Sequence, residues 1–291
     1  MASAASPLDG RIDLHSHSRA SDGQYPAAEV ARRAAQAGVK VWALCDHDTV
    51  AGMPAAAAAA AELGVRLVPG IELSAFLEKR EIHLLGHFLD HQHPTLRRFE
   101  DFLAEQRRER MHLIVGKLAA LGVHIRITDI EKFGDGKIIG RPHVARAIVE
   151  TGAAGSVKEA FDRYLGDGRP AFVGRYRLEA DEAVRLVRGA GGVTTVAHPG
   201  VSRLERFELE RLRTAGVEGL EVHHPDHNPS VREKYLRIAE ALDLVPTAGS
   251  DFHGEAIAPD RHLGEVTMDP DQLARLEARR PQPAGAVRQP A

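Results

Sequence analysis

The sequence predicts an α/β fold. Short apolar runs alternate with helix-forming segments, glycine or proline marks the ends of several of these segments, and histidines or carboxylates follow the apolar runs. This alternation implies parallel strands buried beneath helices, as an open sheet or a closed barrel. A nucleotide-binding open sheet is disfavoured because the sequence holds no Gly-x-Gly-x-x-Gly motif and no Walker-type loop.

Strand and helix alternate in the first ninety residues. Pro26 opens and Gly38 closes one helical segment, and Gly64 closes an alanine-rich one. The apolar runs are too short for buried helices and are bounded by polar residues. We therefore expect strands at 12–15, 39–44, 66–69 and 81–88, and helices at 26–38 and 54–63.

The alternation stops near residue 90 and resumes near residue 180. The intervening block has helical patterns at 94–121, 140–151 and 157–165, so residues 91–185 are predicted to be a mainly helical insertion. Residues 11–90 and 186–270 are expected to form one domain, and the Pro/Gln/Ala-rich segment 281–291 a disordered tail. In the second part of that domain we expect helices at 179–188, 205–215 and 231–242, and strands at 193–197, 219–222 and 245–248.

Composition narrows the class of protein. The chain has 291 residues, of which 43% are hydrophobic and 27% charged, and its single cysteine rules out a disulfide framework. No apolar run approaches the ~20 residues of a membrane helix, and the first residues lack a signal-peptide pattern, so we expect a cytoplasmic protein with no membrane partner. The net charge of −3 disfavours a general polyanion binder. Residues 91–185 nevertheless hold 17 Lys and Arg against 14 Asp and Glu, whereas the remainder holds 21 against 27.

Candidate metal ligands recur along the whole chain. His15 and His17 are one residue apart on a strand, so their side chains point to the same face. Parallel strands deliver their carboxyl ends to one edge, where α/β barrels carry their sites. Imidazole and carboxylate ligands without thiolates suit Mn²⁺, Zn²⁺ or Fe²⁺, and their number suggests two or three ions. The candidates are His15, His17, Asp22, His47, Glu72, His83, His198, Asp251 and His253.

These motifs resemble the polymerase-and-histidinol-phosphatase (PHP) family of metal-dependent phosphoesterases. The resemblance spans about residues 11–266 and implies a distorted (β/α)7 TIM-like barrel with a trinuclear metal centre. It rests on Asp13-Leu14-His15-Ser16-His17, Ser21-Asp22-Gly23, Asp46-His47-Asp48-Thr49, Gly70-Ile71-Glu72, Ile82-His83-Leu84-Leu85-Gly86, Ala197-His198-Pro199 and Gly249-Ser250-Asp251-Phe252-His253.

The resemblance also implies how the ligands are shared. His15, His17 and Asp251 would hold one metal, and Asp22, His47 and His253 the second. His83 and His198 would hold the third, with Glu72 bridging the first and third. Many relatives carry histidine where this chain has Asp22, and an oxygen ligand there favours Mn²⁺ over Zn²⁺.

Within the family, the insertion and the segment Gly140-Arg141-Pro142-His143-Val144-Ala145 resemble a bacterial subgroup. Its members are 3',5'-nucleoside bisphosphate phosphatases and 5'-to-3' exoribonucleases that act on short RNA. We therefore expect hydrolysis of the 3'-phosphate of a nucleoside 3',5'-bisphosphate (pAp to AMP and phosphate) by a metal-activated hydroxide.

There are four alternatives to that activity. The first is an exoribonuclease acting on short 5'-phosphorylated RNA, and a weaker one is histidinol-phosphate phosphatase. A non-catalytic metal-binding module is disfavoured because no ligand position is lost. The length excludes a polymerase proofreading module, and we expect no DNA-binding module. The oligomeric state is left open.

Further residues are assigned to catalysis and to the substrate. Glu72, His83 and His198 are expected to be catalytic as metal ligands, and Asp48 to orient a ligand or the water, or else to accept a supporting hydrogen bond. The insertion would form a cap on the substrate side. Its Arg141 would grip a phosphate with two hydrogen bonds, the alternative being a local salt bridge. His143, Arg107, Arg110 and His224 are further candidates for substrate contact, while His223 and His227 receive no definite role.

Overall fold

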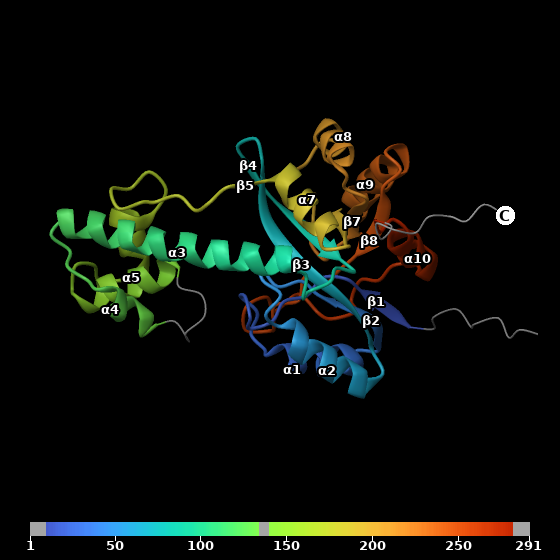
Figure 1. The fold of residues 1–291 in the computed structure, drawn as a ribbon, viewed down its shortest axis with the longest axis horizontal. Helices are drawn as coiled ribbons and strands as arrows, with labels where there is room; N and C mark the ends of the chain where they lie inside the picture. Colours follow the sequence, from blue (N-terminus) through green and yellow to red (C-terminus); the bar gives the residue numbers. More distant parts are fainter. Residues whose placement is uncertain (1–9, 134–139, 282–291) are drawn as a thin grey trace, which may run out of the picture. The chain divides into compact units, whose positions relative to one another are not determined.

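The computed structural model describes residues 10–133 and 140–281 (Figure 1). From residue 282 onward, the tail expected to be disordered lies outside the described residues. The chain divides into two compact units, one formed by Met1–Arg97 with Leu178–Ala291 and the other by Arg98–Arg177. We refer to them as the barrel unit and the helical unit.

The barrel unit is built on one mixed sheet. Its strands follow the order β1-β2-β3-β4-β6-β7-β8, with the short β5 added beside β3. All neighbours on this path pair in parallel except β4, which is antiparallel to both β3 and β6. The strands are β1 (Arg11–Asp13), β2 (Val39–Leu44), β3 (Arg66–Leu77), β4 (Arg80–His87), β5 (Leu178–Glu179), β6 (Val193–Val196), β7 (Gly219–His223) and β8 (Val245–Ala248).

Backbone contacts just beyond β1 and β8 join the two ends of this sheet. The amide of Leu14 donates to the carbonyl oxygen of Ala248 at 3.0 Å, and Ser16 forms an isolated parallel bridge with Phe252. A Cβ on Gly249 would lie 2.2 Å from the Cβ of His15, so the absence of a side chain permits this close approach. The α/β class predicted from the sequence is confirmed, and its strands surround a shared apolar core.

The expectation of parallel strands throughout is wrong at β4. Only two residues, Glu78 and Lys79, separate β3 from β4, and Glu78 has a positive φ of 57°. A two-residue connection makes an antiparallel hairpin, whereas a parallel crossover needs a dozen or more residues. The strand predicted at 66–69 also continues to Leu77. As a result, Glu72 and His83 lie within strands and not at strand ends.

Helices cover the strands of the barrel unit, with α1 and α2 on one side and α7, α8 and α9 on the other (Figure 1). Gly64 ends α2 in a left-handed conformation with a φ of 65°, as its position after the alanine run predicts. The sequence did not predict α10. The helices are α1 (Ala27–Gln36), α2 (Met53–Leu63), α7 (Ala180–Gly189), α8 (Arg206–Ala215), α9 (Pro229–Ala241) and α10 (Pro270–Ala278).

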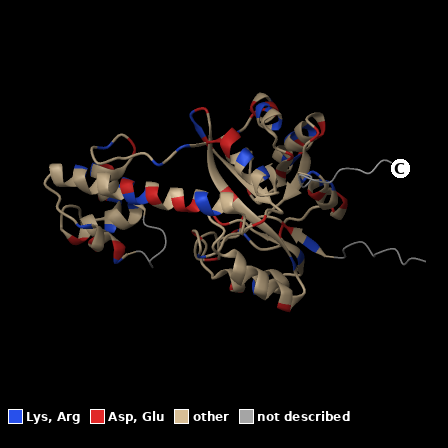
Figure 2. Ribbon diagram, in the orientation of Figure 1, with Lys and Arg blue, Asp and Glu red and all other residues tan. Residues whose placement is uncertain are grey.

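The helical unit has a core of its own, to which Ile114, Ile130, Val144 and Leu165 contribute. Figure 2 shows acidic and basic residues interspersed along α3, which is consistent with its polar composition. The segment predicted as one helix at 157–165 changes at Phe161 from α-helix to π-helix. The elements are α3 (Pro94–Ala120), which begins in the barrel unit, α4 (Ile127–Glu131), α5 (Arg141–Glu150), α6 (Val157–Ala160) and η1 (Phe161–Leu165). Among the described residues of the chain, no helix is long and apolar enough to span a membrane.

Candidate metal centre

Glu72 lies at the middle of the candidate site and is almost fully buried, with 1% of its surface exposed. It is held in place by backbone pairing beyond β2, because its amide donates to Asp46 and its carbonyl accepts from Asp48. The side chains around it come from β4 and from segments that follow β1, β2, β6 and β8. The structure thus gathers the nine candidate ligands from distant parts of the sequence into one region of the barrel unit.

The first group consists of His15, His17, Glu72 and Asp251, all buried. Nε2 of His17 lies 3.1 Å from both Oε2 of Glu72 and Oδ1 of Asp251. Nε2 of His15 lies 3.2 Å and 3.3 Å from the same two oxygens, and 3.0 Å from Nε2 of His17. Four ligand atoms therefore converge on one point, as binding of a single cation requires.

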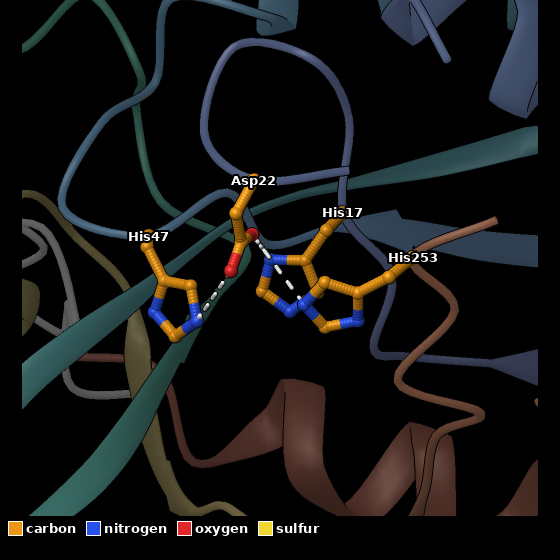
Figure 3. A group of neighbouring side chains, drawn as sticks. All are labelled: His17, Asp22, His47 and His253. Carbon is orange, nitrogen blue, oxygen red and sulfur yellow. Dashed lines mark ion pairs between the residues drawn. The ribbon is translucent and has the colours of Figure 1, made fainter. Parts of the chain in front are cut away.

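The second group consists of His17, Asp22, His47 and His253 (Figure 3). Oδ1 of Asp22 lies 3.4 Å from Nε2 of His253 and 3.6 Å from Nδ1 of His17. Oδ2 of Asp22 lies 3.7 Å from Nε2 of His47. His17 therefore faces the first group with one ring nitrogen and the second with the other. The side chain of Asp22 is 53% exposed, so this group borders solvent.

The third group consists of His47, Glu72 and His83. Nδ1 of His83 lies 2.9 Å from Oε1 of Glu72, and Nδ1 of His47 lies 3.3 Å from Oε2. His198 adjoins this group, because its Nε2 lies 3.2 Å from Oε1 of Glu72. The two carboxylate oxygens of Glu72 thus connect the first group with the third.

Several buried ligand atoms in these groups have no hydrogen-bond partner among the described residues. They are Nδ1 of His17, His47 and His83, and Oε2 of Glu72. A buried polar atom that lacks a partner costs about 1–3 kcal/mol, so this concentration in one place calls for a ligand. Nitrogen and oxygen donors without thiolates fit divalent cations such as Mn²⁺, Fe²⁺ or Zn²⁺.

The pKa values of the group members reflect their mutual proximity. Burial alone would raise the pKa of Glu72, but the charges of His47, His15 and His83 outweigh it and hold that pKa well below its usual range. Asp251 is affected in the same direction, chiefly by His15 and His17. For His17, the effect of burial is outweighed by the neighbouring carboxylates of Asp251 and Glu72, which raise its pKa to about 9. Both carboxylates are therefore ionised at neutral pH and able to serve as ligands.

Glu221 supports the site, and the sequence analysis did not single it out. It is buried on β7, and its Oε1 accepts a hydrogen bond from Nδ1 of His15 at 2.9 Å. Its Oε2 accepts from the amide of His198 at 2.7 Å. With a cation bound, a proton held on Nδ1 of His15 by Glu221 would leave the lone pair of Nε2 for the first group. The only signal in the sequence was a single acidic residue within the apolar run of β7.

Asp251 is supported by Arg261 and His224. The Arg261 guanidinium pairs with Oδ2 of Asp251 and, at 2.7 Å, with Asp226. His224, predicted to touch the substrate, is fully buried with its Nε2 3.5 Å from the same Asp251 oxygen. Its Nδ1 accepts from the amide of Asp226 at 3.1 Å. This position favours a role in orienting Asp251. Arg261 was not predicted because its loop has no periodic pattern.

Asp46 and Asp48 accept hydrogen bonds from segments next to the site. Oδ1 of Asp46 accepts from the amide of Ser18 and from the hydroxyl of Ser21, both at 2.7 Å, and so orders the loop that carries Asp22. Oδ1 of Asp48 accepts from the amide of Ser74 on β3 at 3.1 Å. The Asp48 contact corresponds to the supporting role that the sequence analysis left open beside water orientation.

The remaining substrate candidates belong to the helical unit. The Arg141 guanidinium donates to Asp167 at 2.8 Å and to the carbonyl of Leu165 at 3.2 Å. Arg110 donates to the carbonyl of Val173 at 2.9 Å, and its pKa is lowered by burial and by the neighbouring Arg141. Nδ1 of His143 accepts from the amide of Gly140 at 3.0 Å, and Arg107 lies on α3 with Arg110. The charge of Arg141 therefore acts on Arg110 within this unit.

Comparisons with known proteins agree with this geometry. A 3',5'-nucleoside bisphosphate phosphatase of Chromobacterium violaceum is 35% identical over 247 residues, which cover 83% of this chain and 87% of the relative. A 5'-3' exoribonuclease of Haemophilus influenzae is also 35% identical over 247 residues, with 84% and 90% covered.

Among solved structures, a protein of Bifidobacterium adolescentis described as a metal-dependent phosphoesterase superposes with a TM-score of 0.75 at 30% identity. The superposition covers 96% of this chain and 99% of that one. The family model for the PHP domain matches residues 13–164. The chain therefore belongs to the PHP domain family.

Proposed function

We propose that this protein is a metal-dependent phosphoesterase that removes the 3'-phosphate from nucleoside 3',5'-bisphosphates. The observation that supports this most strongly is the set of three adjoining ligand groups. Glu72 is common to the first and third groups, and the second shares His17 with the first and His47 with the third. Phosphate ester hydrolysis needs charge neutralisation and an activated water, and clustered divalent cations supply both when bound. The similarity to a 3',5'-nucleoside bisphosphate phosphatase supports the choice of substrate.

A second candidate is 5'-to-3' hydrolysis of short RNA. The relative from Haemophilus influenzae that bears an exoribonuclease name is as similar in identity as the phosphatase. Both reactions cleave a phosphate ester beside a ribose and use the same ligand groups. They differ in whether the 3' side of the bound nucleotide is closed or continues as a chain.

In this proposal, some residues of the barrel unit bind the cations and others hold those ligands in place. His15, His17 and Asp251 hold the first cation, Asp22, His47 and His253 the second, and His83 and His198 the third, with Glu72 shared. Glu221 fixes the proton of His15 on Nδ1, which leaves Nε2 available as a ligand. Arg261 pairs with Oδ2 of Asp251, with His224 close to the same oxygen, and Oδ1 of Asp251 faces the first group.

The metal identity and the substrate contacts are parts of the same proposal. We favour Mn²⁺, two or three ions per chain, because the exposed Asp22 contributes a carboxylate oxygen to a group otherwise made of imidazoles. In the helical unit, Arg141, with Arg110, Arg107 and His143, is proposed to bind a substrate phosphate as part of a cap. The single cysteine supports a cytoplasmic location.

An assay of inorganic phosphate release, with release of mononucleotides followed in parallel for the dinucleotide, tests the proposed function. Protein stripped with a chelator and reloaded with Mn²⁺ is offered adenosine 3',5'-bisphosphate (pAp), a 5'-phosphorylated dinucleotide and histidinol phosphate. We expect the highest kcat/KM on pAp and no turnover before reloading. Preference for the dinucleotide would favour the exoribonuclease instead, and preference for histidinol phosphate would overturn both nucleotide proposals.

A further inference from the structure

A hollow of about 530 Å³ lies next to the second group. Asp22 and His253 form part of its wall, so the hollow is continuous with that group. Its volume falls in the range of small-molecule sites, about 300–1,000 Å³. The rest of the wall comes from residues 225–226 after β7 and from the loop 257–265 after β8, all within the barrel unit.

One part of this wall is apolar. Pro225, Ile257, Ala258 and Pro259 line the hollow, and Ile257 is 52% exposed. A large aliphatic side chain beside a group of charged ligands leaves apolar surface in contact with water. A flat, weakly polar ring that packs on these side chains would remove that surface from solvent.

The other part of the wall carries more negative than positive charge. The residues that line the hollow include four carboxylates, those of Asp22, Asp226, Asp260 and Glu265, and one guanidinium, that of Arg261. The Arg261 guanidinium is already paired with Asp226 and Asp251. A second phosphate placed here would be repelled by these carboxylates, whereas sugar hydroxyls would donate hydrogen bonds to them.

We propose that this hollow binds the uncharged nucleoside part of the substrate. The base packs on Ile257 and its proline neighbours, the ribose hydroxyls donate to the carboxylates of the wall, and the phosphate to be removed lies at the ligand groups. The second phosphate of a bisphosphate is then bound outside the hollow. This inference rests on the proposed function and assigns the part of the structure that recognises the nucleoside.

The experiment compares three variants that leave every proposed metal ligand in place. Ile257→Ser removes the apolar surface and Ala258→Trp fills the hollow. Phe207→Ser, on α8 away from this hollow, removes another exposed apolar side chain and serves as the control. For each Mn²⁺-loaded protein, the KM is measured for pAp and for glycerol 2-phosphate, which has no base. The inhibition constant of adenosine is measured with glycerol 2-phosphate as the substrate. Thermal unfolding and metal content show whether each variant is folded and loaded.

We expect Ile257→Ser to raise the KM for pAp and the inhibition constant of adenosine by about 10-fold, the lower end of the range for a lost apolar contact. Ala258→Trp should raise both further, while the constants for glycerol 2-phosphate change less than about twofold. Equal adenosine inhibition in Ile257→Ser and Phe207→Ser would overturn the inference, even if pAp remains a good substrate. If the unsubstituted protein fails to hydrolyse pAp but shows Ile257-dependent inhibition by adenosine, the proposed function fails and the nucleoside site stands.

Discussion

The two units hold their charged residues in different surroundings. In the barrel unit, Glu72 and the histidines around it are buried, so each charge depends on its neighbours for stabilisation. In the helical unit, Arg141 pairs with Asp167, whose side chain is 83% exposed, and such surface pairs contribute about 0–1 kcal/mol. Substitutions in the first setting should therefore abolish chemistry, whereas substitutions in the second should change substrate use with little effect on folding.

The largest effect is expected from Glu72→Gln. Loss of the buried charge shared by two ligand groups should reduce the bound metal and, with it, abolish turnover. Removal of one partner from a buried charge network also lowers the free energy of unfolding by about 3–5 kcal/mol. Turnover and metal content are measured together. Glu78→Gln, at the tip of the same hairpin with a side chain 71% exposed, is the control. Full metal content and normal turnover in Glu72→Gln would contradict the proposal that Glu72 is a ligand shared by two groups.

Glu221→Gln tests whether a buried residue that is not a proposed ligand supports metal binding in the barrel unit. The amide can still reach His15 but no longer stabilises a proton on Nδ1 by charge, so metal affinity should fall about 10- to 100-fold. Titration of the metal-free protein with Mn²⁺ measures this directly. An unchanged affinity would mean that Glu221 serves only the packing of β7.

Arg141 tests the helical unit. Arg141→Ala should lower kcat/KM for pAp about 10- to 100-fold, since a charge-assisted hydrogen bond contributes about 1.5–3 kcal/mol. Arg141→Lys should lose less but still lose activity, because lysine cannot form two parallel hydrogen bonds to a phosphate. The loss should be small for an aryl phosphate, which has no second phosphate.

The control for Arg141 is its partner in the surface pair. Asp167→Asn should leave the thermal unfolding midpoint nearly unchanged, because that carboxylate is exposed. Equal losses on pAp and the aryl phosphate would place Arg141 at the reacting phosphate or in the fold, and no loss on either would leave it as a surface ion pair.

The smallest effect is expected from substitution of His87, which should change how the free energy of unfolding depends on pH. Burial lowers the pKa of His87 to about 4, partly opposed by its hydrogen bond to the carbonyl of Leu14. The folded pKa lies below the ordinary value of 6.5, so the stabilisation is complete above that pH and is lost as the pH falls toward 4. Between pH 7.5 and 5, the free energy of unfolding should fall by about 2 kcal/mol more in the unsubstituted protein than in His87→Gln. Parallel pH curves in urea unfolding would contradict this.

Local patterns in the sequence were sufficient for most helices, and they indicated residues that the structure brings together around Glu72. Gly64 ends α2 where predicted, and β8 spans the predicted residues, because capping and apolar runs are local properties. The direction of β4 was missed because the strand continued beyond Pro69 to Leu77 and left only two residues for a turn. Sheet register is set by long-range pairing, which periodicity does not reveal.

Supporting residues of the site were harder to predict than ligands. Glu221 and Arg261 act through contacts with residues 206 and 10 positions away in sequence, His15 and Asp251. Neither has a motif of its own, and each is recognised only when the partner's position in space is known. The α4 helix was missed because it is only five residues long, too short for periodicity to identify.

Direct observation of bound ions tests the metal centre most sharply. The protein would be stripped, reloaded with Mn²⁺ and crystallised, and anomalous diffraction would locate the metal. We predict at least two peaks that share Glu72 as a ligand, one beside His15, His17 and Asp251 and another beside His83 and His198, with the second group occupied as well when three ions bind. Peaks only at sites remote from Glu72, together with full phosphoesterase activity in the stripped protein, would contradict the metal centre described above.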